Sequence, residues 1–203
     1  MADEIRLTNA VLRPWRLDDA EPIAKYANNR NIWRNLRDRF PHPYSLQDAH
    51  DFLAGRVEIG SSLGVQRAPT IETSFAIEVD GEAAGSIGLL LNDDIHRGTA
   101  ELGYWLAEPH WGRGIATEAA RAMVAYGFEH LELRRIEAVV FAWNPASARV
   151  LEKTGLTLEA RLRKQVIKDG GHGRAALRDH LARLASDSRG HTKKPPVGAA
   201  SSV

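Results

Sequence analysis

The sequence predicts an α/β (α+β) domain with a mixed, mostly antiparallel central sheet and flanking helices. Three successive strand-like segments joined by short turns predict an antiparallel meander: Thr73–Val79, Glu82–Leu91 and Thr99–Leu106. A helical segment over Ala116–His130 then separates the third strand from an apolar, β-branched strand over Arg135–Ala142. A strand, a helix and another strand in succession require a parallel crossover, so we expect the sheet to be mixed.

Length and composition indicate one globular domain. The chain has 203 residues, of which 43% are hydrophobic and 26% are charged, and these values are typical of a globular protein. We expect the domain to extend over residues 1–185. Residues 186–203 contain Ser, Gly, Lys-Lys and Pro-Pro with little apolar content, which predicts a disordered C-terminal tail.

Charge and composition exclude several kinds of partner. The formal net charge of +1 is too balanced to indicate nucleic acid as an obligate partner. The chain has 0 Cys, and its 8 His show no metal-binding spacing, so no metal site is expected. No segment resembles a signal peptide or approaches the roughly 20 apolar residues of a membrane span, which predicts a cytoplasmic protein without a membrane partner.

The N-terminal elements follow from periodicity, proline and capping residues. The first strand is expected to end at Arg13, because Pro14 follows it. Ser45, followed three residues later by Asp48, is typical of a capping box at the start of a helix. The other segments expected before the meander are a strand, a helix, a short helical piece and a loop: Ile5–Arg13, Ala20–Asn28, Asn31–Leu36 and Gly60–Pro69.

Turn residues place the remaining elements. Asp80-Gly81 is a strong signal for a hairpin turn. A helix is expected to open at Asn144-Pro145 and to run through Lys153, with Gly155 as its C-terminal cap. The other expected turns and strands include a closing hairpin around a glycine-rich turn: Asn92–Gly98, Leu158–Lys168, Asp169–Gly173 and Ala176–Leu184.

A glycine-rich turn between a strand and a helix carries the clearest functional signal. It reads Trp-Gly-Arg-Gly-Ile-Ala-Thr over Trp111–Thr117. The first N–H groups of the following helix have no intrahelical partner, and the helix dipole adds positive potential there. Because Gly112 and Gly114 lack side chains, the amides from Gly112 to Thr117 can surround a pyrophosphate. Arg113 either adds a charge or faces solvent.

Two familiar phosphate-binding motifs do not fit this turn. A P-loop needs Gly-Lys-Ser/Thr, whereas Gly114 is followed by Ile115. A dinucleotide-binding fingerprint needs a third glycine where Thr117 stands, and it follows a strand of a parallel βαβ unit rather than an antiparallel meander. The simplest alternative is a glycine-rich connection that binds no ligand.

Two segments resemble the GNAT superfamily of N-acetyltransferases. The superfamily pyrophosphate motif reads Gln/Arg-x-x-Gly-x-Gly/Ala, with Trp111, Gly114 and Ala116 at its defined positions. Trp in the first position departs from the broad motif and resembles the RimJ/RimL-type branch, where Tyr-Trp-Gly-x-Gly-x-Ala is usual. The segment from Asn144 to Gly155 is similar to the Asn-x-x-Ser-x-x-x-x-Glu-Lys-x-Gly-Phe helix of that branch. The resemblance extends from roughly residue 5 to residue 184.

The resemblance implies a GNAT-like sheet with a splayed strand pair that holds acetyl-CoA as co-substrate, without a metal. The pantetheine arm lies between the strands that end at Leu106 and near Ala142. Asn144 faces the arm, caps its helix, or does both. The residues expected to bind the co-substrate are Tyr104, Trp105, Leu106, Trp111, Gly112, Arg113, Gly114, Ile115, Ala116, Thr117, Asn144 and Ser147.

Two residues are candidates for catalysis. Glu101 lies on the strand that leads to the loop, where the superfamily often keeps a catalytic Glu; the alternatives are a water relay as base and an ion-paired strand Glu. A backbone N–H near Leu106 is implied as the donor to the thioester oxygen. Many superfamily members protonate the sulfur with a Tyr of the last helix, which this helix lacks. Ser147 is the available hydroxyl there; its alternative is an ordinary surface Ser.

The acceptor is predicted less sharply. The early helices line the acceptor groove in this family, so Trp33, Asn35 and Phe40 are candidates for substrate contact, and packing on the sheet is the alternative for the two rings. The resemblance implies transfer of an acetyl group to a primary amine, either a protein or peptide N-terminus or a small molecule. A non-catalytic acyl-CoA-binding regulatory module is the second hypothesis. The chain is expected to be a monomer or a homodimer.

Overall fold

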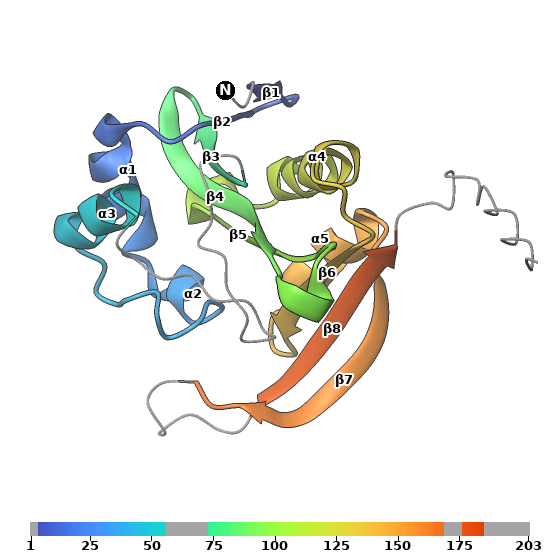
Figure 1. Ribbon diagram of the computed structural model, residues 1–203. Helices are drawn as coiled ribbons and strands as arrows, with labels where there is room; N and C mark the ends of the chain where they lie inside the picture. Colours follow the sequence, from blue (N-terminus) through green and yellow to red (C-terminus); the bar gives the residue numbers. More distant parts are fainter. Residues whose placement is uncertain (1–3, 56–72, 169–175, 185–203) are drawn as a thin grey trace, which may run out of the picture.

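The computed structural model describes residues 4–55, 73–168 and 176–184. Eight strands form one sheet in the order β1-β2-β3-β4-β5-β6-β8-β7 (Figure 1). The strands are β1 (Ile5–Arg6), β2 (Val11–Arg13), β3 (Ser74–Val79), β4 (Glu82–Leu91), β5 (Thr99–Leu106), β6 (Arg135–Phe141), β7 (Thr157–Val166) and β8 (Ala176–Leu184). The α-helices are α1 (Ala20–Ala27), α2 (Arg30–Trp33), α3 (Leu46–Leu53), α4 (Ile115–His130) and α5 (Pro145–Lys153).

The sheet has the predicted mixed character. β5 and β6, which are joined through α4, pair in parallel, and every other neighbouring pair is antiparallel. The turn between β3 and β4 places Asp80 and Gly81 at φ 52° and 86°. Positive φ at both positions is typical of the turn that matches the twist of a two-residue hairpin, so the predicted hairpin is confirmed.

The first predicted strand is wrong in one respect. Instead of one strand over Ile5–Arg13, two short strands, β1 and β2, pair with each other. The Leu7 N–H donates to the Ala10 C=O at 2.9 Å and closes a tight turn. The Thr8 N–H in this turn donates to Glu118 Oε2 of α4 at 2.9 Å. A contact from a distant helix thus holds the reversal, and local periodicity does not show it.

Capping residues begin and end the helices as expected. Ser45 Oγ accepts from the Asp48 N–H at 3.2 Å, and the Ser45 N–H donates to Asp48 Oδ2 at 2.8 Å, which forms the predicted capping box of α3. Gly155, at φ 86°, follows α5 and donates its N–H to the Glu152 C=O at 2.9 Å. The predicted loop at 60–69, the turn at 169–173 and the tail from 186 lie outside the described residues.

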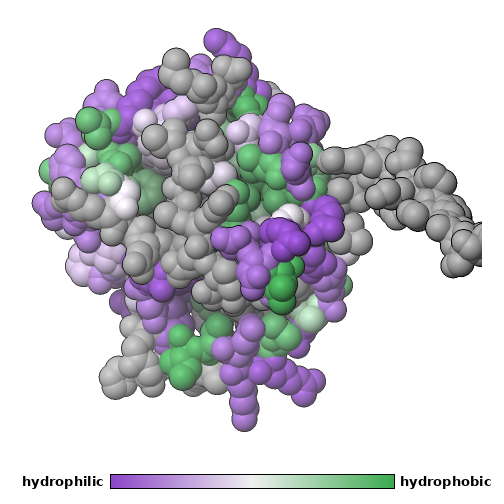
Figure 2. All heavy atoms as spheres, in the orientation of Figure 1, coloured by the Kyte–Doolittle hydropathy of each residue, from purple (hydrophilic) through white to green (hydrophobic). Residues whose placement is uncertain are grey.

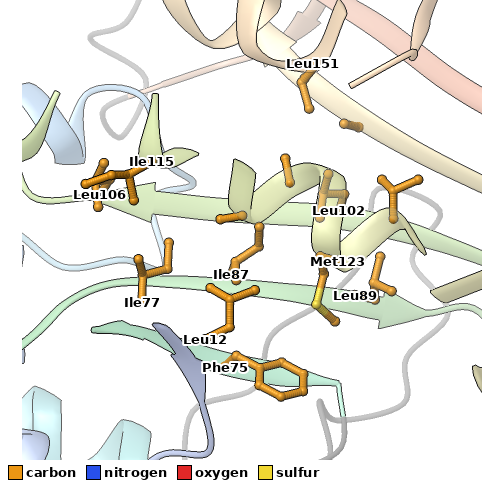
Figure 3. Packing of buried hydrophobic residues seen from close by; sticks show 14 of the residues in the cluster. Leu12, Phe75, Ile77, Ile87, Leu89, Leu102, Leu106, Ile115, Met123 and Leu151 are labelled. Carbon is orange, nitrogen blue, oxygen red and sulfur yellow. The ribbon is translucent and has the colours of Figure 1, made fainter. Parts of the chain in front are cut away.

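The helices cover the two faces of the sheet. Residues of α4 pack with one face of β2 to β6 in the main hydrophobic core, which includes Leu12, Phe75, Ile87 and Met123 (Figure 3). Residues of α1 and α3 form a second cluster that Trp105 joins from the other face of β5. Successive side chains of a strand alternate between faces, so β5 contributes to both layers. The site can therefore be built from both faces of this strand.

Where Figure 2 colours the surface, much of it is hydrophilic, and hydrophobic residues occur in small separate groups between the hydrophilic ones. Within the described ranges, no helix is both long and apolar enough to cross a membrane. The same residues contain no group of three or more His, Cys, Asp or Glu side chains placed to hold a metal ion.

Candidate active site

Strands β5 and β6 separate part-way along their length. Their last register pair is Glu101 with Glu137, whereas β5 continues to Leu106 and β6 to Phe141. The gap between the two strands beyond Glu101 and Glu137 is called the fork below. The splayed strand pair expected from the resemblance is therefore present.

The backbone of β5 presents alternate residues to its two sides. In an antiparallel pair, one residue exchanges hydrogen bonds with its partner strand and the next points its N–H and C=O away. The Ala107 N–H donates to the Ala84 C=O at 2.8 Å, and the β4–β5 register is continuous. The backbone groups of Trp105 therefore face β4. Those of Tyr104 and Leu106 face the fork, where β6 no longer pairs with β5.

A cavity of about 1000 Å³ includes the fork. This volume is at the upper end of the range typical of ligand sites. Its walls come from both sheet faces: the chain around and after α2, the length of β5, the turn before α4, the end of β6, α5 and the end of β7. Of the twelve residues expected to bind acetyl-CoA, all except Arg113 line this cavity.

One end of the cavity is formed by residues 111–117 and is called the loop end. Gly112 and Gly114 have φ of 76° and 82°, and at neither does a heavy atom of the described residues, chain neighbours aside, lie within 4 Å of where a Cβ would stand. Gly114 is the N-terminal cap of α4, so the N–H groups of Ile115 and Ala116 have no intrahelical acceptor. The Thr117 N–H donates to the Gly114 C=O at 3.0 Å. The loop end thus presents open backbone and the positive end of a helix.

Trp111 ties the loop end to β5. Its indole Nε1 donates to the Leu106 C=O at 2.7 Å, although the residue is 46% exposed. Leu106 and Ile115 also lie close together where β5 ends and α4 begins (Figure 3), and both are buried. The Trp that replaces Gln or Arg of the broad motif therefore fixes the loop against the strand.

Arg113 is not among the described residues that line the cavity, although His110, which it contacts, is one of them. The Arg113 Nη1 lies 2.9 Å from His110 Nδ1 and 3.9 Å from Asp80 Oδ2 at the β3–β4 turn. Neither of the two expectations for this side chain is decided by these contacts. The N-terminus of α4 is a source of positive potential within the cavity wall itself.

Helix α5 brings two predicted residues to the opposite side of the fork. Asn144 Oδ1 accepts from the Ser147 N–H at 3.1 Å, which confirms the capping role of Asn144. Ser147 Oγ lies 2.7 Å from the Tyr104 hydroxyl, which comes from β5. All three residues line the cavity. Ser147 is thus a partly buried residue in contact with the strand rather than an ordinary surface Ser.

Glu101 is buried where the fork opens, with only 5% of its surface exposed. Arg37, which follows α2, places Nη2 2.5 Å from Glu101 Oε1. Glu137, its register partner on β6, is also buried and lies 3.3 Å from Arg135 Nε. The ion-paired alternative for Glu101 is therefore present, while Glu101 itself lines the cavity.

A second ion pair stands near the first. Lys168 Nζ lies 2.6 Å from Asp38 Oδ1 and 3.9 Å from the centroid of the Trp33 ring. Trp33 also stacks on His42, with ring centroids 5.4 Å apart. Arg37, Asp38, Glu101 and Lys168 line the cavity together and are called the ion-pair end. Trp33 is not one of the described lining residues, and it contributes to this end through its contact with Lys168.

The other two candidates for substrate contact line the cavity. Asn35 Oδ1 accepts from Trp143 Nε1 at 3.2 Å, which links the segment after α2 to the end of β6. Phe40 packs against Tyr44 and Trp105, with centroid distances of 4.9 and 6.1 Å. Asn35 and Phe40 thus line the cavity and also contact neighbouring side chains of the protein.

The arrangement of fork, loop end and sheet order matches a known family. Residues 9–157, which are most of the chain, match the acetyltransferase (GNAT) domain. The chain belongs to the GNAT family. Its structural neighbours include Mycobacterium smegmatis RimJ in complex with CoA-disulfide, with a TM-score of 0.72, 25% identity, and coverage of 89% of this chain and 84% of RimJ.

Two curated GNAT relatives differ in the acceptor that their names state. YdaF of Bacillus subtilis (strain 168), provisionally named a ribosomal N-acetyltransferase, is 38% identical over 93 residues, which are 46% of this chain and 50% of YdaF. The spermidine N(1)-acetyltransferase of Escherichia coli (strain K12) is 27% identical over 164 residues, which are 81% of each chain. The match to YdaF thus spans about half the length of that relative.

Sequence reasoning missed the contacts that three side chains of this GNAT site make. Arg37 and Lys168 form the ion pairs of the wall, and the Tyr104 hydroxyl contacts Ser147. The partners are 64, 130 and 43 residues apart in sequence. The one local signal was the position of Tyr104, since alternation along β5 puts its side chain on the α4–α5 face.

Proposed function

We propose that this GNAT chain transfers an acetyl group from acetyl-CoA to a primary amine, and that the acceptor is the N-terminal amine of a protein or peptide. The fork carries this proposal. It connects the N-terminus of α4 at the loop end with the buried Glu101 carboxylate at the ion-pair end, and both line one cavity. Acetyl-CoA supplies the activated acetyl thioester.

The residues at the loop end and along β5 fit a CoA molecule. Unpaired amides at a helix N-terminus are suited to a pyrophosphate. The N–H and C=O groups of Tyr104, which face the fork, are suited to the amides of a pantetheine arm, as an added strand would be. The proposed CoA-binding residues are Tyr104, Trp105, Leu106, Trp111, Gly112, Gly114, Ile115, Ala116, Thr117, Asn144 and Ser147.

Three groups of the chain are proposed to act in the reaction. The Glu101 carboxylate accepts a proton from the acceptor amine, directly or through water, and Arg37 fixes its position. The Leu106 N–H, which faces the fork, donates to the acetyl oxygen as negative charge develops there. The Ser147 hydroxyl donates a hydrogen bond to the sulfur as the carbon–sulfur bond breaks, so that the sulfur leaves as a thiolate. The proton that the amine loses is held by Glu101 or its water and is then released to solvent, so one proton and one thiolate leave as the amide forms.

The charges at the ion-pair end favour a peptide over a polyamine. A polyamine carries several ammonium groups, which need carboxylates to pair with them. Glu101 lies 2.5 Å from Arg37, and Asp38 lies 2.6 Å from Lys168, so each carboxylate already has a cation beside it. The carbonyl groups of a peptide can instead accept hydrogen bonds from such cations. This supports an acceptor of the kind named for YdaF rather than spermidine.

Thiol release from acetyl-CoA with matched acceptors tests the proposal. One peptide is used with a free and with a blocked N-terminus, beside spermidine and small primary amines. We expect release with the free peptide, none above background with the blocked one, and a kcat/KM at least about 10-fold higher for the free peptide than for spermidine. Higher activity on spermidine contradicts the peptide assignment. Tight CoA binding without release for any acceptor identifies a non-catalytic acyl-CoA-binding module.

A further inference from the structure

The contact between Tyr104 and Ser147 joins the two sides of the fork. Tyr104 belongs to β5 and Ser147 to α5, and their hydroxyl oxygens are 2.7 Å apart. The Tyr104 hydroxyl also lies 3.4 Å from the Ser147 C=O, which is at the limit of a hydrogen bond. The shorter contact is therefore the main hydrogen bond of Tyr104. Only one of the two hydroxyls can donate its proton to this bond, and the other accepts.

The chemistry of the two hydroxyls decides which one donates. A phenol is a much stronger acid than an aliphatic hydroxyl, so the Tyr104 O–H is the better donor and Ser147 Oγ the better acceptor. With that hydrogen bond made, the proton of Ser147 cannot point at Tyr104. Within the described parts of the chain, Tyr104 is the one side-chain partner of Ser147 Oγ, so the Ser147 proton is left for a group in the cavity.

The surroundings keep both residues in place. The Asn144 side chain holds the Ser147 N–H at 3.1 Å and so fixes the first turn of α5. The β4–β5 ladder fixes the backbone of Tyr104, whose N–H and C=O face the fork. Burial raises the pKa of Tyr104 to about 12. Tyr104 therefore stays protonated at ordinary assay pH and acts as a donor that keeps its proton.

We propose that Tyr104 is a positioning residue that turns the Ser147 hydroxyl proton into the fork, toward a departing thiolate. This inference rests on the proposed acetyl transfer and adds to it a side chain outside α5. No proton is transferred along this pair: Tyr104 donates a hydrogen bond to Ser147 Oγ, and Ser147 donates a hydrogen bond to the thiolate, with each hydroxyl keeping its proton. In this way β5 orients the one hydroxyl side chain of α5, a helix that lacks the Tyr with which many superfamily members protonate the sulfur.

A readout that needs no turnover tests the orientation of Ser147. The affinities of CoA and of desulfo-CoA are measured by calorimetry across the pH range in which the CoA thiol ionises. A hydroxyl aimed at the sulfur favours the thiolate, so the wild-type protein should gain affinity for CoA relative to desulfo-CoA as pH rises. In Tyr104→Phe and in Ser147→Ala this gain should fall about 10-fold, the scale of one hydrogen bond to a charged group.

Kinetics provide a second measurement on the same variants. Tyr104→Phe should lower kcat about 10-fold with little change in the KM for acetyl-CoA. Since both residues act through one hydroxyl, Tyr104→Phe combined with Ser147→Ala should be no slower than Ser147→Ala alone. Tyr26→Phe is the matched control, because it also removes a hydroxyl contact between elements, at 2.6 Å from Glu82, away from the fork. It should change neither readout.

The outcomes separate this inference from the proposed function. If Tyr104→Phe keeps the wild-type preference for the thiolate, or if its effect on kcat adds in full to that of Ser147→Ala, the positioning role is wrong. If the thiolate preference depends on Tyr104 but no amine is acetylated, the positioning role stands and the proposed function fails. Thermal unfolding of each variant verifies that it is folded, and Phe preserves the ring that packs on the core.

Discussion

The two ends of the cavity are built from different kinds of group. At the loop end, the structure presents backbone: amides at the start of α4, two glycines with positive φ, and a Trp indole that fixes the turn to β5. At the ion-pair end, it presents charged side chains from segments far apart in the chain. A site built from backbone groups tolerates substitution of side chains but not a change of backbone conformation. A site built from side chains is instead sensitive to substitution of the side chains that form it.

The largest effect is expected at the loop end, from Gly114→Val. Gly114 has a φ of 82°, which disfavours a β-branched residue, and the new side chain occupies the space beside the first amides of α4. Loss of two hydrogen bonds to a charged group should weaken CoA binding more than about 1000-fold, or about 4 kcal/mol, by calorimetry.

Gly81→Val is the control for backbone strain. Gly81 has a φ of 86° and lies in the β3–β4 turn. Like Gly114, it has open space at its Cβ position, with no heavy atom of the described part of the chain, neighbours aside, within 4 Å. It should lower the thermal stability in a similar way and leave CoA affinity unchanged. Equal CoA affinity for Gly114→Val and Gly81→Val rules out residues 111–117 as the pyrophosphate site.

A smaller effect, on turnover and not on CoA affinity, is expected at the ion-pair end. Glu101→Gln removes the proposed base but keeps its shape, so turnover should fall about 100-fold while CoA affinity stays within about 2-fold. The loss should be greatest at low pH, where most of the amine is protonated. Glu137→Gln changes the buried register partner on β6 and serves as the control. Unaltered turnover of Glu101→Gln across the pH range removes Glu101 from the role.

The smallest effect is expected from Arg113→Ala. This Arg stands in the middle of the motif, but its guanidinium contacts His110 and lies near Asp80. CoA affinity should therefore change less than about 2-fold, since exposed charges contribute little beyond their immediate contacts. A 10-fold weaker affinity in calorimetry would show that side-chain charge, and not backbone alone, operates at the loop end.

The same contrast explains how far the sequence predicts this molecule. The loop end depends on the local order strand, glycine, helix, which the spacing of Gly112 and Gly114 shows directly. The hairpin at Asp80-Gly81, the capping box at Ser45 and the parallel crossover are local in the same sense, and all three were predicted. These features need only the conformational preferences of neighbouring residues.

The features that escaped prediction depend on distant partners. The pairing of Arg37 with Glu101 and of Asp38 with Lys168 requires the segment after α2 to meet β5 and the end of β7. The reversal between β1 and β2 is held by Glu118 of α4. No periodicity within either segment encodes such contacts. Nor did the sequence show that the Arg113 side chain contacts His110, because that depends on the turn that precedes the loop end.

The alternation of backbone groups along strand β5 limits how the length of this chain can vary. Its even-numbered residues 104 and 106 turn their backbone groups toward the fork, and residue 105 turns its groups toward β4. Inserting or deleting one residue upstream in the strand exchanges these two sets and moves each side chain to the other face. Homologous chains should thus almost never differ in the number of residues in β5, with insertions confined to the turns at either end.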